Sequence, residues 1–73
     1  MTRSEVVRLM IEKANSLYAN GWSRDSEDEI WTICSDWNSN NPESEIFMSE
    51  HVSEKTGYAD GFYIEDDYWV FEN

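Results

Sequence analysis

The spacing of apolar residues changes at about residue 40, and this change is the strongest constraint on the fold. Before the polar segment Ser39-Asn40-Asn41-Pro42, apolar residues recur three and four positions apart, which is typical of amphipathic helices. After it, short runs rich in aromatic and β-branched residues are typical of strands. Because each element must bury its apolar side, we predict an α+β fold in the order ααβββ. Two N-terminal helices pack on a small antiparallel β-sheet that ends in a C-terminal hairpin.

The first helix is expected from about Ser4 to Asn20. Thr2 and Glu5 have the spacing of a capping box, in which the hydroxyl accepts from a first-turn amide and the carboxylate binds back. Gly21 follows the last periodic residue and suits a left-handed C-terminal cap. The expected apolar stripe consists of Val6, Val7, Met10, Ala14, Leu17 and Tyr18.

The second helix is expected from about Glu27 to Trp37. Ser26 and Glu29 repeat the capping-box spacing, so Ser26 is the predicted N-cap. Acidic residues crowd the first turn, where the helix dipole favours negative charge. The expected buried stripe consists of Ile30, Ile33, Cys34 and Trp37.

Residues 45–52 alternate apolar and polar side chains, which favours a strand. The segment Asn41-Pro42-Glu43 could instead begin a third helix, because proline is tolerated at a first helical position. If residues 45–52 form an edge strand, that strand could also pair two copies of the chain into a homodimer.

The last segment, residues 62–71, predicts a β-hairpin with an acidic turn. With Asp66-Asp67 as the turn residues, Ile64 faces Trp69 and Phe62 faces Phe71, so all four lie on the core side. A longer turn that includes Glu65 remains open. The opposite face would carry Tyr63, Tyr68 and Val70.

The length of 73 residues predicts a single domain, residues 1–73, with a modest core. Cys34 is the only cysteine, so no disulfide can stabilise the chain, and a lone thiol suits a reducing compartment. Eleven aromatic residues supply large side chains for the core instead. With no apolar run long enough for a membrane span, we expect a complete, untargeted cytoplasmic protein.

The negative charge is concentrated after residue 24. Residues 1–24 hold four basic residues and two carboxylates, whereas residues 25–73 hold fourteen carboxylates and one lysine, a net charge of −13. Such a field repels nucleic acid and anionic lipid and attracts basic protein surfaces. We therefore expect a basic protein partner, with no direct nucleic-acid binding and no membrane contact.

The residues that could act in catalysis or bind a metal ion form no specific motif. A nucleophilic pair of Cys34 and His51 is disfavoured because Cys34 falls on a buried stripe. Carboxylate pairs are abundant, but so short a chain leaves little room for a walled substrate cleft beside its core. The acidic runs 25–29 and 65–67 lack the glycine of a calcium loop. We predict no enzyme activity, no catalytic residues, no metal site and no cofactor.

The predicted partner-binding surface combines carboxylates with two aromatic anchors. Carboxylates pair with arginine in the same bidentate way as phosphates do, and Tyr and Trp are frequent interface hot spots. The predicted residues are Asp25, Glu27, Asp28, Glu29, Trp31, Asp36, Glu43, Glu45, Glu50, Glu65, Asp66, Asp67 and Tyr68.

In size and acidity, over its whole length but without a shared motif, the chain resembles small phage-encoded DNA mimics. These include anti-restriction proteins, anti-CRISPR proteins and inhibitors of uracil-DNA glycosylase. The resemblance implies an inhibitor that occupies a basic, nucleic-acid-binding surface, in the host cytoplasm if it is phage-encoded. Two other hypotheses stay open: an immunity, antitoxin or regulatory protein that binds a basic partner through exposed aromatics, and a housekeeping protein whose acidity maintains solubility.

Overall fold

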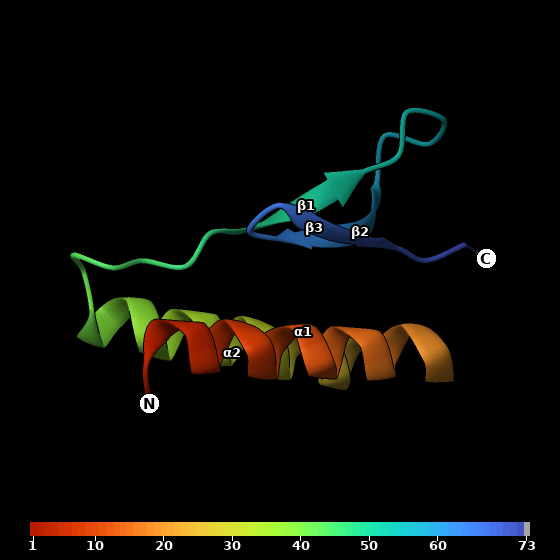
Figure 1. Cartoon of the computed structure of the whole chain (residues 1–73). Helices are drawn as coiled ribbons and strands as arrows, with labels where there is room; N and C mark the ends of the chain where they lie inside the picture. Colours follow the sequence, from red (N-terminus) through yellow and green to blue (C-terminus); the bar gives the residue numbers. More distant parts are fainter. Residues whose placement is uncertain (73) are drawn as a thin grey trace.

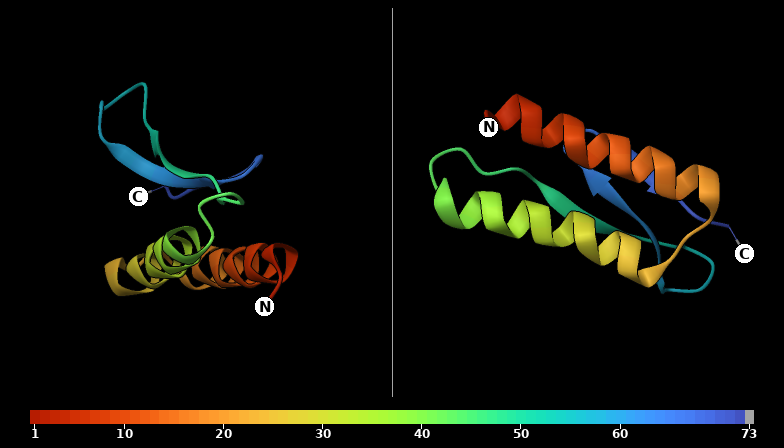
Figure 2. Two further views of the ribbon diagram at one scale, coloured as in Figure 1. Left: turned by 90° about the vertical axis from the view of Figure 1, so that its left-hand side faces the viewer. Right: turned by 90° about the horizontal axis from the view of Figure 1, so that it is seen from below.

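The computed structural model describes residues 1–72, which form a helical layer and a sheet layer (Figure 1). The helices are α1 (Arg3–Asn20) and α2 (Arg24–Asn40), and the strands are β1 (Met48–Val52), β2 (Ala59–Ile64) and β3 (Asp67–Val70). The sheet is antiparallel with the order β1-β2-β3. Both helices lie on the same side of it (Figure 2). The predicted ααβββ arrangement is confirmed.

The start of α1 is the predicted capping box. The Thr2 amide donates to Glu5 Oε1 at 2.9 Å, and the Glu5 amide donates to Thr2 Oγ1 at 3.2 Å. These bonds satisfy two amides that would otherwise lack partners in the first turn. The helix ends at Asn20, as expected, and its fully buried side chains are Val6, Met10, Ala14 and Leu17.

Two details at the end of α1 differ from prediction. Gly21 has a φ of 90° as glycine permits, but its ψ of 144° is extended, so the predicted left-handed cap is wrong. Tyr18 was expected in the buried stripe but is 59% exposed. It lies in the last turn of the helix, where its ring packs against Phe71 with a centroid distance of 5.7 Å.

Helix α2 begins three residues earlier than predicted. Its N-cap is Ser23, whose Oγ accepts from the Ser26 amide at 3.2 Å, so the assignment of Ser26 as the cap is wrong. The helix also extends past Trp37 to Asn40, where Asn40 and Asn41 side chains each donate to a carbonyl of the last turns at 2.9 Å. On its inner side, Ile30 and Cys34 are buried, and Ile33, Trp37 and Trp31 are partly buried against the core.

Residues 48–52 form strand β1, so the favoured strand is confirmed and a third helix is excluded there. Ile46, just before the strand, is 2% exposed and enters the core. A register shift between His51 and Val52 interrupts the alternation, and Val52 is 52% exposed.

The hairpin between β2 and β3 turns at Glu65 and Asp66. Ile64 pairs with Asp67 and Phe62 pairs with Trp69, so the predicted register is wrong. Glu65 adopts a φ of 53°, and its amide donates to the Phe47 carbonyl at 2.9 Å, which supports a tight turn. The register differs from prediction by two positions, so every side chain keeps its predicted face.

The core lies between the helices and the sheet. It consists of Val6, Met10, Ala14, Leu17, Ile30, Cys34, Ile46, Phe62, Ile64 and Trp69, with Phe71 partly buried beside them. In residues 1–72, no helix is long and apolar enough to cross a membrane.

Candidate partner-binding surface

The carboxylates predicted to bind a partner all lie outside the core. Among the residues that the structure describes, no charged or polar residue is buried. Glu27 and Glu65 are half-buried. The fully exposed members are Asp25, Asp28, Glu29, Asp36, Glu43, Glu45, Glu50, Asp66 and Asp67.

Helix α2 presents an acidic stripe along its exposed side. Asp25, Asp28, Glu29 and Asp36 are separated by three, one and seven residues, which places them on one side of the helix. At a rise of about 1.5 Å per residue, the stripe is about 16 Å long. Glu29 is partly neutralised, because Lys13 of α1 donates to its Oε1 at 2.6 Å.

Glu27 joins two tryptophans at the start of α2. Its Oε1 accepts from Trp22 Nε1 at 2.7 Å, and its Oε2 accepts from Trp31 Nε1 at 2.9 Å. The predicted anchor Trp31 packs against the core and has its indole N–H engaged, whereas Trp22 is 52% exposed. Of these two rings, Trp22 is therefore the more accessible to a partner.

The hairpin turn carries a second acidic group. Glu65 forms an ion pair with Arg3, which also donates from Nη2 to the Glu45 carbonyl at 2.9 Å. Asp66 and Asp67 remain exposed beside Tyr68, which is 63% exposed.

This hairpin group lies on the α1 side of the molecule. Trp69 of β3 donates from Nε1 to Asn15 Oδ1 of α1 at 2.9 Å. The ion pair from Arg3 joins the turn to the start of the same helix. The acidic stripe lies on the other helix, so the stripe and the hairpin group do not form one continuous face.

The remaining predicted carboxylates lie on the connection after α2 and on β1. Glu43 and Glu45 belong to the loop that leads from α2 to the sheet. Glu50 is in register with Phe62 but stays exposed on the edge strand β1. The pairing of two copies through this edge stays a prediction.

An aromatic cluster on the uncovered side of the sheet was not predicted as a unit. The rings of His51, Tyr63 and Tyr68 lie 5.5 to 6.2 Å apart, centroid to centroid. His51 Nδ1 lies 2.5 Å from Asp60 Oδ1. The alternation of residues 62–71 placed both tyrosines on this face, but the position of His51 depends on the register between β1 and β2, for which the sequence carries no local signal.

Cys34 and His51 are held in different layers. Cys34 lies on α2 and its thiol contacts the Ile46 carbonyl at 3.5 Å, whereas His51 packs with Tyr63 and Tyr68 on the other face of the sheet from the core. Burial raises the pKa of the Cys34 thiol, and hydrogen bonding from Asn38 opposes that rise. Across residues 1–72, no three His, Cys, Asp or Glu side chains are grouped to hold a metal ion.

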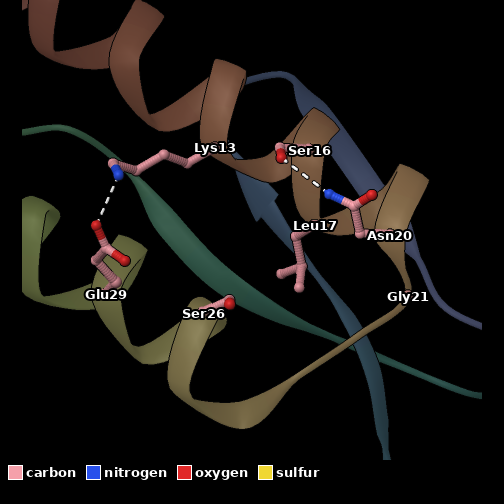
Figure 3. Close-up of a pocket in the computed structure, with 7 residues that line it drawn as sticks. All are labelled: Lys13, Ser16, Leu17, Asn20, Gly21, Ser26 and Glu29. Atoms are coloured by element: carbon pink, nitrogen blue, oxygen red, sulfur yellow. Dashed lines mark hydrogen bonds and ion pairs between the residues drawn. The ribbon is translucent and has the colours of Figure 1, made fainter.

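Two shallow hollows mark the surface. One, of about 170 Å³, lies between the end of α1 and the start of α2 and is bordered by the Lys13–Glu29 pair (Figure 3). It is smaller than the roughly 300–1,000 Å³ of a typical ligand pocket. The other, of about 390 Å³, is an open depression between α1 and β3 that Asp66 and Asp67 border.

No protein-family profile, curated protein or solved structure matches the chain. Function is therefore inferred from the exposed charges, the aromatic face and their contacts.

Proposed function

We propose that this chain is an acidic inhibitor that binds a basic, nucleic-acid-binding surface of a target protein and excludes nucleic acid from it. One observation carries the proposal: the carboxylates of the acidic segment lie at the surface with few cations beside them. In residues 1–72, the ion pairs of lysine or arginine with a carboxylate are Arg3–Glu65 and Lys13–Glu29. Most of the −13 charge of residues 25–73 is therefore available to a partner.

The helical scaffold gives this charge a fixed spacing. A rigid α2 holds its exposed carboxylates in a row, and carboxylates pair with arginine forks as phosphates do. The negative electrostatic field of these carboxylates also speeds the encounter with a basic surface. A net charge of −11 exceeds the magnitude of about 2–8 that keeps a small domain soluble, and its self-repulsion weakens the fold. A binding role accounts for that cost.

The proposed target is an enzyme or complex of the host cytoplasm that acts on nucleic acid, such as a restriction or CRISPR nuclease. This subclass follows from the resemblance in size and acidity to phage-encoded DNA mimics. The chain contributes no catalytic group in this account, because occupation of the basic groove is enough to exclude the nucleic acid.

A second candidate is an immunity, antitoxin or regulatory protein that binds mainly through exposed rings. It is favoured by five aromatic side chains that are more than half exposed, namely Tyr18, Trp22, Phe47, Tyr58 and Tyr68. Aromatic anchors that enter pockets of a partner contribute through desolvation, so their binding depends little on salt.

The experiment uses proteins that elute from DNA-cellulose as the pool of candidate targets. The pool is applied to the immobilised chain and to its Asp25→Asn/Asp28→Asn/Asp36→Asn variant, which removes three charges without changing side-chain size. Thr32→Asn changes the same exposed side of α2 with no loss of charge and serves as the matched control.

We expect the native chain and the Thr32→Asn control to retain a target that duplex DNA releases, and the triple variant to retain at least about fivefold less. Retention that persists in duplex DNA and is equal for all three proteins would reject the proposal. Retention that survives high salt but is lost on Trp22→Ala or Tyr68→Ala would favour the second candidate.

A further inference from the structure

We infer that the uncovered face of the sheet is the docking site for an arginine side chain of the basic partner, an inference that rests on the proposed function. Three rings gather there: His51 from β1, Tyr63 from β2 and Tyr68 from β3. His51 and Tyr68 are stacked with an interplanar angle of 17° and a centroid distance of 6.2 Å. Tyr63 lies 5.9 Å from Tyr68 and 5.5 Å from His51.

This face has no cover within the described chain. Both helices lie on the opposite side of the sheet, as two perpendicular views show (Figure 2). The strand registers place Tyr68 beside Tyr63, and in the next row they place Gly61 between His51 and Val70. Gly61 is itself buried, so its neighbours pack closely around it.

The negative charge of this part of the chain favours a cationic side chain as the group that binds to the rings. Asp60 contacts His51 on this face, whereas Asp66 and Asp67 lie nearby at the hairpin turn, on the side that faces α1. Between residues 48 and 70, Lys55 is the only lysine or arginine. A second copy of the chain, a nucleic acid or an anionic membrane would each bring further negative charge to this face and be repelled. A cationic side chain of a protein partner is attracted.

Arginine suits this face better than lysine. Its guanidinium is planar, stacks on aromatic rings and still donates to carboxylates at the ring edges. Lysine is a compact, strongly hydrated charge that gains less from stacking. The aromatic face therefore adds a preference for arginine that acidity alone does not supply.

The test uses two defined probes, nona-arginine and nona-lysine, titrated into the full chain at 150 mM NaCl. Aromatic and amide NMR spectra report where each peptide binds and how tightly. The variants are Tyr68→Ala, which removes the most exposed ring of the cluster, and Tyr68→Phe, which keeps the ring. Tyr58→Ala is the matched control, because it removes an even more exposed tyrosine from the β1–β2 loop.

We expect nona-arginine to shift the ring signals of His51, Tyr63 and Tyr68 most, and to bind tighter than nona-lysine. Tyr68→Ala should weaken nona-arginine binding about fivefold, whereas Tyr68→Phe and Tyr58→Ala change it less than twofold. Shifts confined to the acidic stripe of α2, with no effect of Tyr68→Ala, would overturn this inference and leave the proposed function standing. Binding of neither peptide would overturn both.

Discussion

The side chain of Asn38 binds both backbone polar groups of Ile46. Its Nδ2 donates to the Ile46 carbonyl at 3.0 Å, and its Oδ1 accepts from the Ile46 amide at 2.7 Å. Asn38 thereby takes the place of a neighbouring strand for a buried residue that lies outside the sheet. This contact ties the end of α2 to the segment that leads into β1.

Asn38→Ala should destabilise the protein by about 1–3 kcal/mol, because it leaves the Ile46 amide without a partner and the Ile46 carbonyl with only the weak contact from the Cys34 thiol. Urea denaturation followed by tryptophan fluorescence measures the change. Asn40→Ala is the matched control: its side chain donates to the Asp36 carbonyl in an exposed position and should cost less than about 1 kcal/mol. Equal losses for the two variants would contradict the role given to Asn38.

Gly61→Ala should cost about 3 kcal/mol or more, because a Cβ at this position would lie 1.9 Å from the Trp69 carbonyl oxygen. Gly57→Ala, in an open loop at a φ of 76°, meets no atom within 4 Å and should cost only the left-handed strain of about 1–2 kcal/mol. Denaturation curves of both variants make the comparison, and the NMR signal of the Trp69 indole N–H reports the displacement of β3. A Gly61→Ala variant as stable as Gly57→Ala would refute this packing.

Glu5 predicts a pH dependence at the start of α1. The pKa of the Glu5 carboxyl lies below its ordinary value. The main cause is the hydrogen bond from the Thr2 amide, and the second is the interaction with the Thr2 hydroxyl. A carboxyl whose folded pKa is depressed contributes stability above its unfolded pKa, and this contribution is lost as the pH falls through the folded pKa. Thr2→Ala should therefore raise the pKa of Glu5 in a ¹³C NMR titration. Thr2→Ser keeps the hydroxyl and should leave the pKa of Glu5 unchanged. If the pKa of Glu5 rises in both variants, the capping box is not the cause of the lowered value.

The excess charge predicts that salt stabilises this protein. Raising NaCl from 10 to 500 mM shortens the screening length and weakens repulsion among the carboxylates. We expect a gain of about 1 kcal/mol, or about 4–8 °C in Tm. The Asp25→Asn/Asp28→Asn/Asp36→Asn variant, with its net charge reduced from −11 to −8, should gain less. If the Tm falls with salt, or if the native chain and the triple variant gain equally in Tm, repulsion among the carboxylates does not limit stability.

Local patterns predicted the elements that local contacts form. The capping box of Thr2 and Glu5 and the helical stripe of α1 lie within a few residues of one another in sequence, so both could be predicted. The alternation in residues 62–71 assigned the two faces of the hairpin for the same reason. The start of α2 was predicted wrongly because Ser23 and Ser26 are both favourable caps, and the choice depends on the whole first turn.

Contacts between residues that are distant in sequence could not be predicted, because no local sequence pattern marks them. The hairpin register depends on Glu65, whose turn conformation is supported by Arg3 and by Phe47. The cluster of His51 with the two tyrosines exists only because β1 pairs with β2 in one register. Likewise, the separation of the acidic stripe of α2 from the hairpin group follows from how the sheet lies across the helices, which periodicity does not specify.

The central claim, that the acidic surface takes the place of nucleic acid, is tested most directly by asking whether a captured target can hold both ligands at once. Labelled duplex DNA is bound to the target, the chain is added at 50, 100 and 200 mM NaCl, and fluorescence anisotropy follows the DNA while size-exclusion chromatography detects complexes. The account predicts mutually exclusive binding, with an affinity for the chain that falls at least about tenfold over this salt range. A ternary complex of chain, target and DNA, with an affinity that does not change with salt, would contradict it.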